Sequence, residues 1–327
     1  MKQYNLLVTG GAGFIGSNLV KALLNDERVA FVRVLDNLSN GHRHNIEEFL
    51  SDERFEFLEG DIRDYNTVLQ ACKDIDLVSH QAALGSVPRS VQSPLTTNDV
   101  NITGTLNVFT AVKDLGIKRV VFAASSSTYG DSQASPKRED VTGEPISPYA
   151  VTKLVNELYA RVYGKLYGMK YIGLRYFNVF GPKQDPHGAY AAVIPLFMKA
   201  ILENQAPHIH GDGLQSRDFT YVANAVQANL QALFIEREDA LNEIYNIACG
   251  EQTTVLDLYN YLAEIAGSEL KPIHGPNRAG DVKHSLADIS KAKNYLQYNP
   301  GYSVREGLEL VFEWYKDHFR YNPQTIG

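Results

Sequence analysis

Short apolar runs alternate with helical patterns through the first half of the chain. The runs at 6–8, 31–35, 55–58, 76–79, 119–124 and 170–174 have the length and composition of buried strands. Between them, apolar residues recur at helical spacing, as at Leu19, Val20, Leu23 and Leu24. Strands that alternate with helices form parallel sheets covered on both faces. The pattern therefore predicts an α/β fold built on a doubly wound parallel sheet.

Beyond residues 181–182 the strict alternation stops. Residues 191–202 and 219–234 have helical patterns, 208–213 indicates a short strand and turn, and 243–248 a strand that returns to the main sheet. The remainder is mainly helical, with a loop at 275–285. We predict two interleaved domains, a larger one of residues 1–180 with about 219–248 and a smaller α/β one of residues 181–218 with about 249–327.

Three glycines follow the first predicted strand at spacing G-x-x-G-x-x-G. Gly10 permits a sharp strand-to-helix turn, Gly13 lets backbone N–H groups approach a pyrophosphate, and Gly16 lets the helix lie close on the strand. A plain tight turn would explain the glycines alone. An acid twenty residues past Gly16, Asp36, favours a Rossmann-type dinucleotide site. A carboxylate there binds ribose hydroxyls and repels a 2′-phosphate, which favours NAD over NADP despite Arg43.

Other polar residues also follow predicted strands. Asp61, after the third strand, suits either an adenine contact or a helix cap. Small residues at 82–86 follow the fourth strand and allow close backbone approach to a ligand. Asn98 and Asn101 interrupt a helical pattern over 93–115, where anchoring of a loop is favoured over direct chemistry.

Tyr149 and Lys153 lie four residues apart in a predicted helix over 147–167, so their side chains share one face. A phenol titrates near pH ~10, but a nearby ammonium favours the phenolate and makes it a usable base. An exposed helix-surface pair is the alternative. Ser125, Ser126 and Ser127 close the fifth strand, where a hydroxyl can bond the reacting oxygen; a serine-rich turn is the alternative there.

Composition is that of an ordinary globular protein, with 44% apolar and 21% charged residues. The net charge of −7 argues against nucleic acid or an anionic membrane as a partner. Cys72 and Cys249 lack metal-ligand spacing, so we expect reduced thiols and no metal. With neither a signal-peptide layout nor an apolar run of membrane-spanning length, the expected location is cytoplasmic.

Taken in order, these motifs resemble the extended short-chain dehydrogenase/reductase superfamily, in its nucleotide-sugar branch, over essentially the whole chain. Two stretches, 83–90 (ALGSVPRS) and 280–288 (GDVKHSLAD), look closest to the UDP-N-acetylglucosamine 4-epimerase family. The resemblance implies that the larger domain binds NAD and the smaller one the UDP-sugar. It also implies a homodimer formed through a four-helix bundle from the 93–115 and 147–167 helices.

Residue by residue, the resemblance implies three groups of site residues. The catalytic residues would be Ser125, Tyr149 and Lys153. NAD would be held by Gly10, Gly13, Phe14, Ile15, Gly16, Asp36, Asn37, Asp61, Ile62, Ala82, Ala83, Asn98, Tyr149, Lys153 and Tyr176. The UDP-sugar would be held by Gly85, Ser86, Ser126, Ser127, Asn178, Ala192, Val193, Arg217, Arg278, Asp281 and Ser285, with the two arginines on the diphosphate.

The reaction type follows from residues 126 and 127. Dehydratases of this branch carry an acid pair there, and decarboxylases a glutamate, whereas this chain has Ser126 and Ser127. Elimination is thus unsupported, and reversible C4 epimerisation through a transient 4-keto sugar remains, with tightly bound NAD regenerated in each turnover. The resemblance implies that small residues, among them Gly85, Ala192 and Ser285, line the hexose and leave room for a 2-N-acetyl group. We therefore expect UDP-GlcNAc and UDP-GalNAc as substrates. UDP-glucose and UDP-galactose, a UDP-uronic acid met by Arg89, and a non-catalytic NAD-binding regulator stay open as alternatives.

Overall fold

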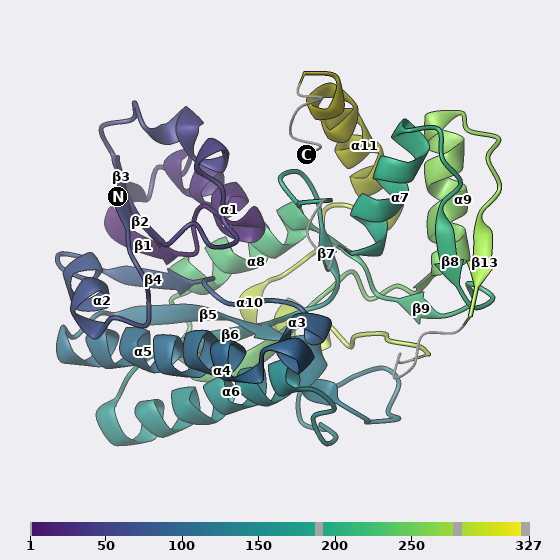
Figure 1. Ribbon diagram of the computed structural model, residues 1–327. Helices are drawn as coiled ribbons and strands as arrows, with labels where there is room; N and C mark the ends of the chain where they lie inside the picture. The colour runs from purple at the N-terminus through teal and green to yellow at the C-terminus, as the bar shows by residue number, and fades with distance from the viewer. Residues whose placement is uncertain (1, 187–191, 277–282, 322–327) are drawn as a thin grey trace.

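A seven-stranded parallel sheet forms the centre of the computed structural model, which describes residues 2–186, 192–276 and 283–321 (Figure 1). Its strand order is β11-β6-β5-β4-β1-β2-β3, with every pair parallel. The predicted doubly wound α/β fold is confirmed. The strands are β1 (Tyr4–Thr9), β2 (Val29–Asp36), β3 (Phe55–Glu59), β4 (Leu77–His80), β5 (Arg119–Ser125), β6 (Tyr171–Tyr176) and β11 (Glu243–Ile247).

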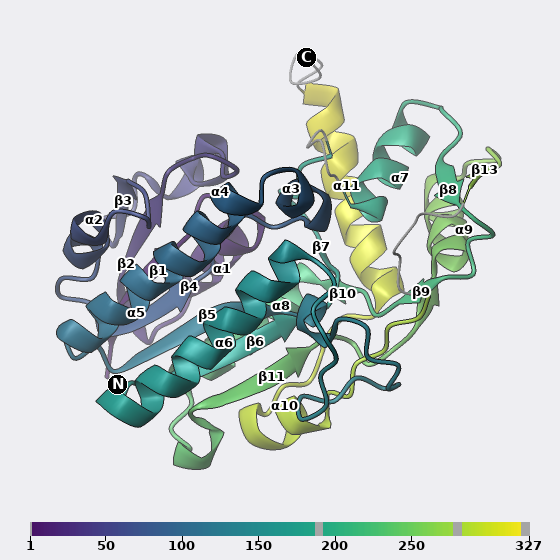
Figure 2. The same ribbon diagram turned by 60° about the horizontal axis from the view of Figure 1, so that its bottom comes forward.

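Helices cover both faces of the sheet. On one face, α1 (Phe14–Leu24) packs beside α8 (Val222–Phe234); on the other, α2 (Tyr65–Ala71), α5 (Gly104–Asp114) and α6 (Pro148–Tyr167) lie side by side (Figure 2). Each face has its own buried apolar cluster. Because both faces are buried, the strands are almost continuously apolar, which is why short apolar runs predicted them.

The second half of the chain builds a smaller lobe beside the sheet, at the right of Figure 1. There α7 (Val193–Leu202), α9 (Val255–Ala266) and α11 (Val304–Tyr321) pack together. Three short strand pairs join this lobe: β7 (Val179–Phe180) with β10 (Thr220–Tyr221), β9 (Ser216–Arg217) with β12 (Thr253–Thr254), and β8 (His208–His210) with β13 (Ile273–Gly275). The helix α10 (Ser290–Leu296) lies against β11. No described helix is both long and apolar enough to cross a membrane.

Several element boundaries differ from the predictions. The helix expected over 93–115 is divided into α4 (Pro94–Asn98), a wider π-type turn (Asp99–Thr103) and α5. The helix expected from residue 219 begins at Val222, because Thr220 and Tyr221 pair with β7. Helices α2 and α3 (Val87–Gln92) were not predicted, since neither is long enough to show clear periodicity. Single 3₁₀ turns lie at Arg43–Asn45, Glu47–Phe49, Ser126–Tyr129 and Glu238–Ala240.

Two buried carboxylates tie distant segments together. Glu157 of α6 forms a bidentate ion pair with Arg175 of β6, with both N···O distances at 2.8 Å. Asp218 accepts from the backbone N–H groups of Cys249, Gly250 and Ala287 at 3.0 to 3.2 Å. Burial raises the pKa of Asp218 to about 7, and those N–H groups oppose the rise. Both carboxylates therefore fix the positions of segments that are far apart in sequence.

His80, the last residue of β4, is buried with a neutral imidazole. Its Nδ1 lies 2.7 Å from the Thr9 hydroxyl and its Nε2 2.9 Å from the Thr105 hydroxyl. Thr105 donates its own proton to the Asn101 carbonyl, so Nε2 carries the ring proton and donates to Thr105. Burial, together with the Lys153 ammonium, lowers the pKa of His80 to about 3.

We expect the free energy of unfolding to fall as the pH drops below the ordinary histidine pKa of 6.5, because only the unfolded chain then binds a proton at residue 80. His80 contributes a loss of at most about 1.4 kcal/mol per pH unit, continuing until the pH nears its folded pKa of about 3. His80→Asn removes the titrating group, so its unfolding free energy should decline less steeply with acid. Equilibrium urea unfolding at several pH values measures both slopes, and equal slopes would contradict a neutral His80.

Candidate active site

A cleft of about 620 Å³ runs along the carboxyl ends of the parallel strands. Its lining comes from the ends of β1, β2, β3, β4, β5 and β6 and the segments that follow them, from Val100, Tyr149 and Lys153 of the covering helices, and from residues 184, 185 and 192. In open α/β sheets, ligands bind outside these strand ends. The topology therefore brings the polar residues predicted at each strand end into one continuous site.

Gly10, Gly13 and Gly16 form the floor of the cleft after β1. A Cβ on Gly16 would lie 2.1 Å from the Gly10 carbonyl oxygen, and one on Gly10, at φ +71°, would lie 2.6 Å from the Ala82 nitrogen. No side chain in the described part of the chain caps α1 at Gly13. The first turn of α1 thus presents backbone N–H groups and its positive dipole end to the cleft, where a pyrophosphate fits. These residues suit a dinucleotide.

Asp36 lies at the end of β2 and lines the same cleft. One carboxylate oxygen accepts from the Ala12 N–H and the other from the Leu38 N–H, both at 2.9 Å. Burial raises the pKa of Asp36, and these two hydrogen bonds oppose the rise. A carboxylate has about four acceptor positions, so Asp36 can still accept from ribose hydroxyls.

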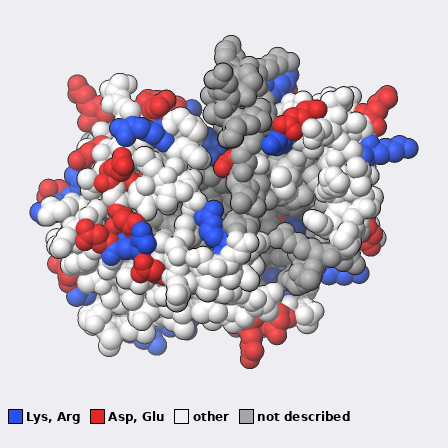
Figure 3. Space-filling model, in the orientation of Figure 1, with Lys and Arg blue, Asp and Glu red and all other residues white. Residues whose placement is uncertain are grey.

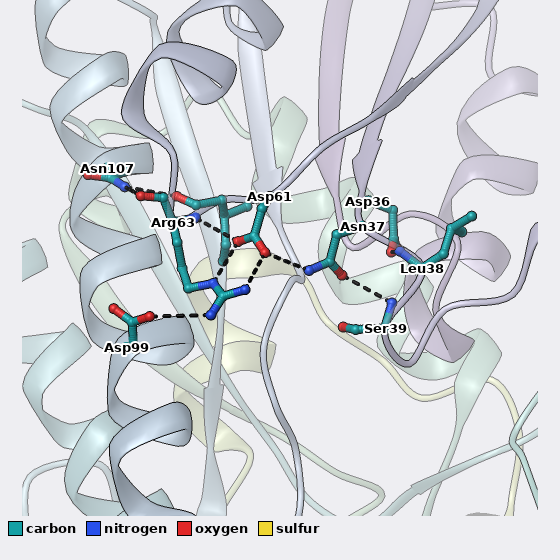
Figure 4. A network of polar contacts seen from close by, with 9 residues as sticks. Asp36, Asn37, Leu38, Ser39, Asp61, Arg63, Asp99 and Asn107 are labelled. Atoms are coloured by element: carbon teal, nitrogen blue, oxygen red, sulfur yellow. Dashed lines mark hydrogen bonds and ion pairs between the residues drawn. The ribbon is translucent and has the colours of Figure 1, made fainter.

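Asp61 is held in a network of polar contacts beside Asp36 (Figure 4). Arg63 donates to both carboxylate oxygens at 2.7 and 3.0 Å, and Asn37 donates at 2.8 Å. Arg63 also reaches Asp99, 3.3 Å away. The Arg63 hydrogen bond lowers the pKa of Asp61 to about 2, so Asp61 is a permanent acceptor at the edge of the cleft. The alternative of a helix cap is wrong, because Asp64 caps α2.

Ser125, Tyr149 and Lys153 meet where β5 ends and α6 begins, and all three line the cleft. Ser147 caps the helix by accepting from the Ala150 N–H, and Pro148 starts its first turn. The Lys153 ammonium lies 5.9 Å from the Tyr149 ring centroid. The Lys153 ammonium also donates to the Ala123 carbonyl at 2.8 Å. The helix spacing of Tyr149 and Lys153, together with the end of β5 at Ser125, therefore brings the three residues predicted to be catalytic to one part of the cleft.

Burial opposes ionisation of both titratable members of this cluster. It raises the pKa of the Tyr149 phenol, while the hydrogen bond with Ser125 opposes the rise. It lowers the pKa of Lys153 to about 8, and the negative charge of Glu157 opposes that shift. In the chain by itself, burial outweighs the effect of the ammonium that the sequence pattern suggested. A further positive charge in the cleft would favour the phenolate.

The loop after β4 is fixed by Asn101 from the π-type turn. The Asn101 amide accepts from the Leu84 N–H at 2.8 Å and donates to the Leu84 carbonyl and to Thr152 of α6. The predicted anchoring role of Asn101 is confirmed. No described heavy atom lies within 4 Å of where a Cβ on Gly85 would be, so this side of the cleft is open. Arg89 turns toward the opposite loop, where it donates to the Asn40 side chain at 2.8 Å.

Most of the residues predicted to bind ligands line the cleft. Every predicted NAD residue does so except Asn98, which is exposed on α4. The predicted substrate residues along it are Gly85, Ser86, Ser126, Asn178 and Ala192. Four predicted substrate residues lie off it: Ser127, which donates to Ser125, Val193, Arg217 and Ser285. Arg278 and Asp281 fall outside the described residues.

Arg217 and Ser285 instead lie together in the smaller lobe. The Ser285 N–H donates to the Ser216 carbonyl at 3.1 Å, next to Arg217 in β9. Arg217 donates to the carbonyl of Ser216 at 2.9 Å. Asn178 connects this group to the cleft, since its amide donates to the Asp218 carbonyl at 2.9 Å.

Sequence reasoning missed Gly41 and did not assign a role to Gln81. A Cβ on Gly41 would lie 2.9 Å from an Asp36 carboxylate oxygen, so glycine is required where this loop crosses Asp36. That requirement depends on how the loop folds back onto Asp36 and the Ala12 backbone, and the sequence gives no signal for it beyond the glycine itself. Charges of both signs are intermixed on the face in Figure 3, so an anionic ligand depends on local donors such as the first turn of α1.

Comparison with known proteins gives the family of the chain and its similarity to solved structures. The family model of the NAD dependent epimerase/dehydratase family matches residues 6–248. A UDP-N-acetylglucosamine 4-epimerase from Methanobrevibacter ruminantium, solved with UDP-N-acetylmuramic acid, is 40% identical over 97% of this chain and 100% of its own, with a TM-score of 0.91. A UDP-glucose 4-epimerase from Thermotoga maritima, solved with UDP-glucose, is 38% identical (96% and 99% coverage, TM-score 0.90). A UDP-glucuronic acid 4-epimerase from Bacillus cereus, solved with its sugar nucleotide and NAD, is 33% identical (96% and 99% coverage, TM-score 0.89).

Proposed function

The chain belongs to the NAD dependent epimerase/dehydratase family and is an NAD-dependent UDP-sugar 4-epimerase, and we propose that it interconverts UDP-GlcNAc and UDP-GalNAc. The observation that carries the reaction type is the meeting of Ser125, Tyr149 and Lys153 in the cleft. Ser126, rather than a carboxylate, occupies the cleft beside them. Without a second acid there, elimination from the sugar has no proton donor, and return of hydride to C4 is the simpler outcome.

The chain's own residues divide the proton chemistry between them. Tyr149, as the phenolate, removes the proton of the sugar 4-hydroxyl, and Ser125 donates a hydrogen bond to the same oxygen. Lys153 holds its positive charge near the phenol below about pH 8, where it favours the phenolate. The cleft residues after β1, β2 and β3 would hold NAD, which would supply reversible hydride acceptance from C4. We assign the diphosphate to Asn178, which lines the cleft, and to Arg217 of the adjoining lobe, which the Asn178–Asp218 hydrogen bond connects to the cleft. The 4-keto sugar turns about this diphosphate to present its other face.

The proposed N-acetyl preference is supported by the small side chains that line the cleft where the hexose would bind. Gly85 adds no side chain and has open space beside it, and Ala192 adds only a methyl group. A 2-N-acetyl group is bulkier than a hydroxyl and must be accommodated in both orientations of the turning sugar. Steric exclusion can reject a substrate strongly, whereas losing a few acetamide contacts costs only roughly 1–3 kcal/mol. An open wall therefore favours the acetylated pair without excluding UDP-hexoses.

We assign the cofactor and the substrate to different parts of the chain. Residues 1–180 with about 219–248 form the NAD-binding domain in this proposal, and residues 181–218 with about 249–327 bind the UDP-sugar. The cleft segments after β1, β2 and β3, which suit the dinucleotide, all belong to the first set. Arg217 and Ser285 belong to the second.

We also propose a homodimer that pairs through α6. Val151, Leu158, Val162 and Leu166 are exposed along one face of α6, with Leu166 at 68%. Helices α3 and α4 lie against α6 (Figure 2). On them, Val91 and Leu95 are also exposed, with Leu95 at 84%. An apolar surface of this kind on packed helices favours burial against a second copy, which would complete a four-helix bundle.

The first test offers the purified protein UDP-GlcNAc, UDP-GalNAc, UDP-glucose, UDP-galactose and UDP-glucuronic acid, with the products resolved by chromatography. We expect the acetylated pair to interconvert fastest and the protein to copurify with NAD. Tyr149→Phe removes the base while leaving the cleft shape intact, so turnover should be abolished with NAD still bound. Rapid turnover of only the uronic acid or the unmodified hexoses would overturn the substrate proposal. Substantial activity in Tyr149→Phe would overturn the role of Tyr149.

Ser285→Tyr tests whether residue 285 limits the size of the 2-substituent. A bulky ring at this position should lower activity on UDP-GlcNAc at least about tenfold and spare UDP-galactose, because only the acetamide needs the space. Ser290→Tyr, at an exposed serine five residues further on, is the matched control and should leave both activities unchanged. Equal effects on both substrates would show that residue 285 does not select between them.

Leu166→Glu tests the dimer. A carboxylate on the exposed face of α6 opposes burial against a second copy, so light scattering should find a dimer for the parent and a monomer for the variant. Leu310→Glu places the same charge on α11, where Leu310 is exposed, and should remain dimeric. A monomeric parent protein would contradict the proposal.

A further inference from the structure

A closed ring of polar side chains lies directly beneath the reaction end of the cleft. We call Ser79, Gln81, Tyr176 and Asn229 the polar ring. The Tyr176 hydroxyl donates to the Gln81 carbonyl oxygen at 3.1 Å, and the Gln81 amide donates to Asn229 at 3.0 Å and to Ser79 at 2.9 Å. Asn229 closes the ring by donating to the Tyr176 hydroxyl at 2.7 Å.

The polar ring joins the cleft surface to the buried side of the sheet. Tyr176 and Gln81 line the cleft, whereas Ser79 and Asn229 are fully buried. Tyr176 is also the register partner of Ser125 across the β5–β6 pair. Asn229 comes from α8, on the far face of the sheet, and lies 148 residues from Gln81 in sequence. A helix that contributes no residue to the cleft lining thus contacts two residues that do.

We propose that Asn229 is a positioning residue that fixes Tyr176 and Gln81 against the bound dinucleotide next to the reacting centre. This inference rests on the proposed NAD site, and it names a residue outside every motif found in the sequence.

The hydrogen-bond directions in the polar ring leave each member one arrangement. Asn229 donates its second amide proton to the Ala225 carbonyl at 2.8 Å. In the flipped orientation, the amide oxygen would face this carbonyl oxygen, and neither atom can donate to the other. Burial raises the pKa of Tyr176 to about 12, so the hydroxyl keeps its proton and donates it to Gln81. Every donor in the polar ring is therefore used. On their buried side, the cleft-facing side chains of Tyr176 and Gln81 are held by hydrogen bonds to Asn229 and Ser79. Loss of Asn229 leaves buried polar atoms unsatisfied and allows both side chains to rotate.

A purely structural role for Asn229, joining α8 to the sheet, is the competing explanation, and the same helix supplies its control. Asn224 is also buried in α8, where it accepts from the backbone N–H groups of Gly301 and Tyr302 and donates to the Tyr302 carbonyl. It is not among the residues that line the cleft. Substitution by leucine, which has the same branched arrangement of side-chain heavy atoms, removes buried hydrogen bonds at either position, but only position 229 belongs to the polar ring.

The experiment measures how fast bound NAD exchanges with labelled NAD in the holoenzyme, together with kcat and KM for the preferred UDP-sugar. Asn229→Leu should exchange NAD roughly tenfold faster and lose roughly ten- to a hundredfold in kcat, with KM for the sugar nearly unchanged. Tyr176→Phe should act in the same direction. The double variant should then be much less impaired than the two single effects combined, because both substitutions break one ring.

Asn224→Leu should unfold at lower temperature while its NAD exchange stays at the parent rate. If Asn229→Leu does not fold, Ser79→Ala removes a smaller part of the polar ring and should still accelerate exchange. NAD exchange at the parent rate in the folded ring variants, or equal acceleration in Asn224→Leu, would overturn the proposal. The exchange assay needs no sugar, so failure of UDP-GlcNAc as a substrate leaves its result unaffected.

Discussion

The close backbone approach at the turn after β1 is the constraint on which the rest of the site depends. Gly16 and Gly10 touch so closely that neither tolerates a side chain, and Gly10 also packs on the backbone of Ala82 after β4. One turn therefore sets the distance of α1 from the sheet, aims the helix N-terminus at the cleft and supports the loop that carries Gly85. The ends of β1 and β4 are adjacent in the sheet, which allows a single contact to organise both.

Local signals were sufficient to predict the sheet and much of the cleft. Apolar runs located all seven strands of the main sheet, and the glycines, Asp36, Tyr149 and Lys153 were found because spacing within one segment carries their chemistry. The partners of Asn229 and Asp218 could not be found this way, since they lie tens to more than a hundred residues away. The π-type turn was missed for a different reason: one widened turn barely disturbs a helical pattern, although it points Asn101 at Leu84.

Burial makes the reaction cluster depend on what occupies the cleft. In the chain alone, burial disfavours both the Tyr149 phenolate and the Lys153 ammonium, and Ser125 and Glu157 offset those effects only in part. In a low-dielectric site of this kind, the interaction between any two charges is stronger than in water. The same burial that holds Tyr149 neutral therefore makes its ionisation sensitive to a positive charge brought into the cleft. Proton transfer is in this way coupled to occupancy.

The residues proposed to select the sugar can vary separately from the reaction cluster of Ser125, Tyr149 and Lys153. Relatives named for UDP-GlcNAc, UDP-glucose and UDP-glucuronic acid all superimpose on this chain with TM-scores of 0.89 to 0.91, so the fold does not distinguish the sugars. The glycine turn and the polar ring are built by the main sheet, α1 and α8, whereas Arg217 and Ser285 sit in segments joined through Asp218. Because the described partners of Asp218 in those segments are backbone N–H groups, side chains there can change without disturbing these hydrogen bonds. In the proposed assignment, sugar specificity is set by side chains on a frame that is fixed through its backbone.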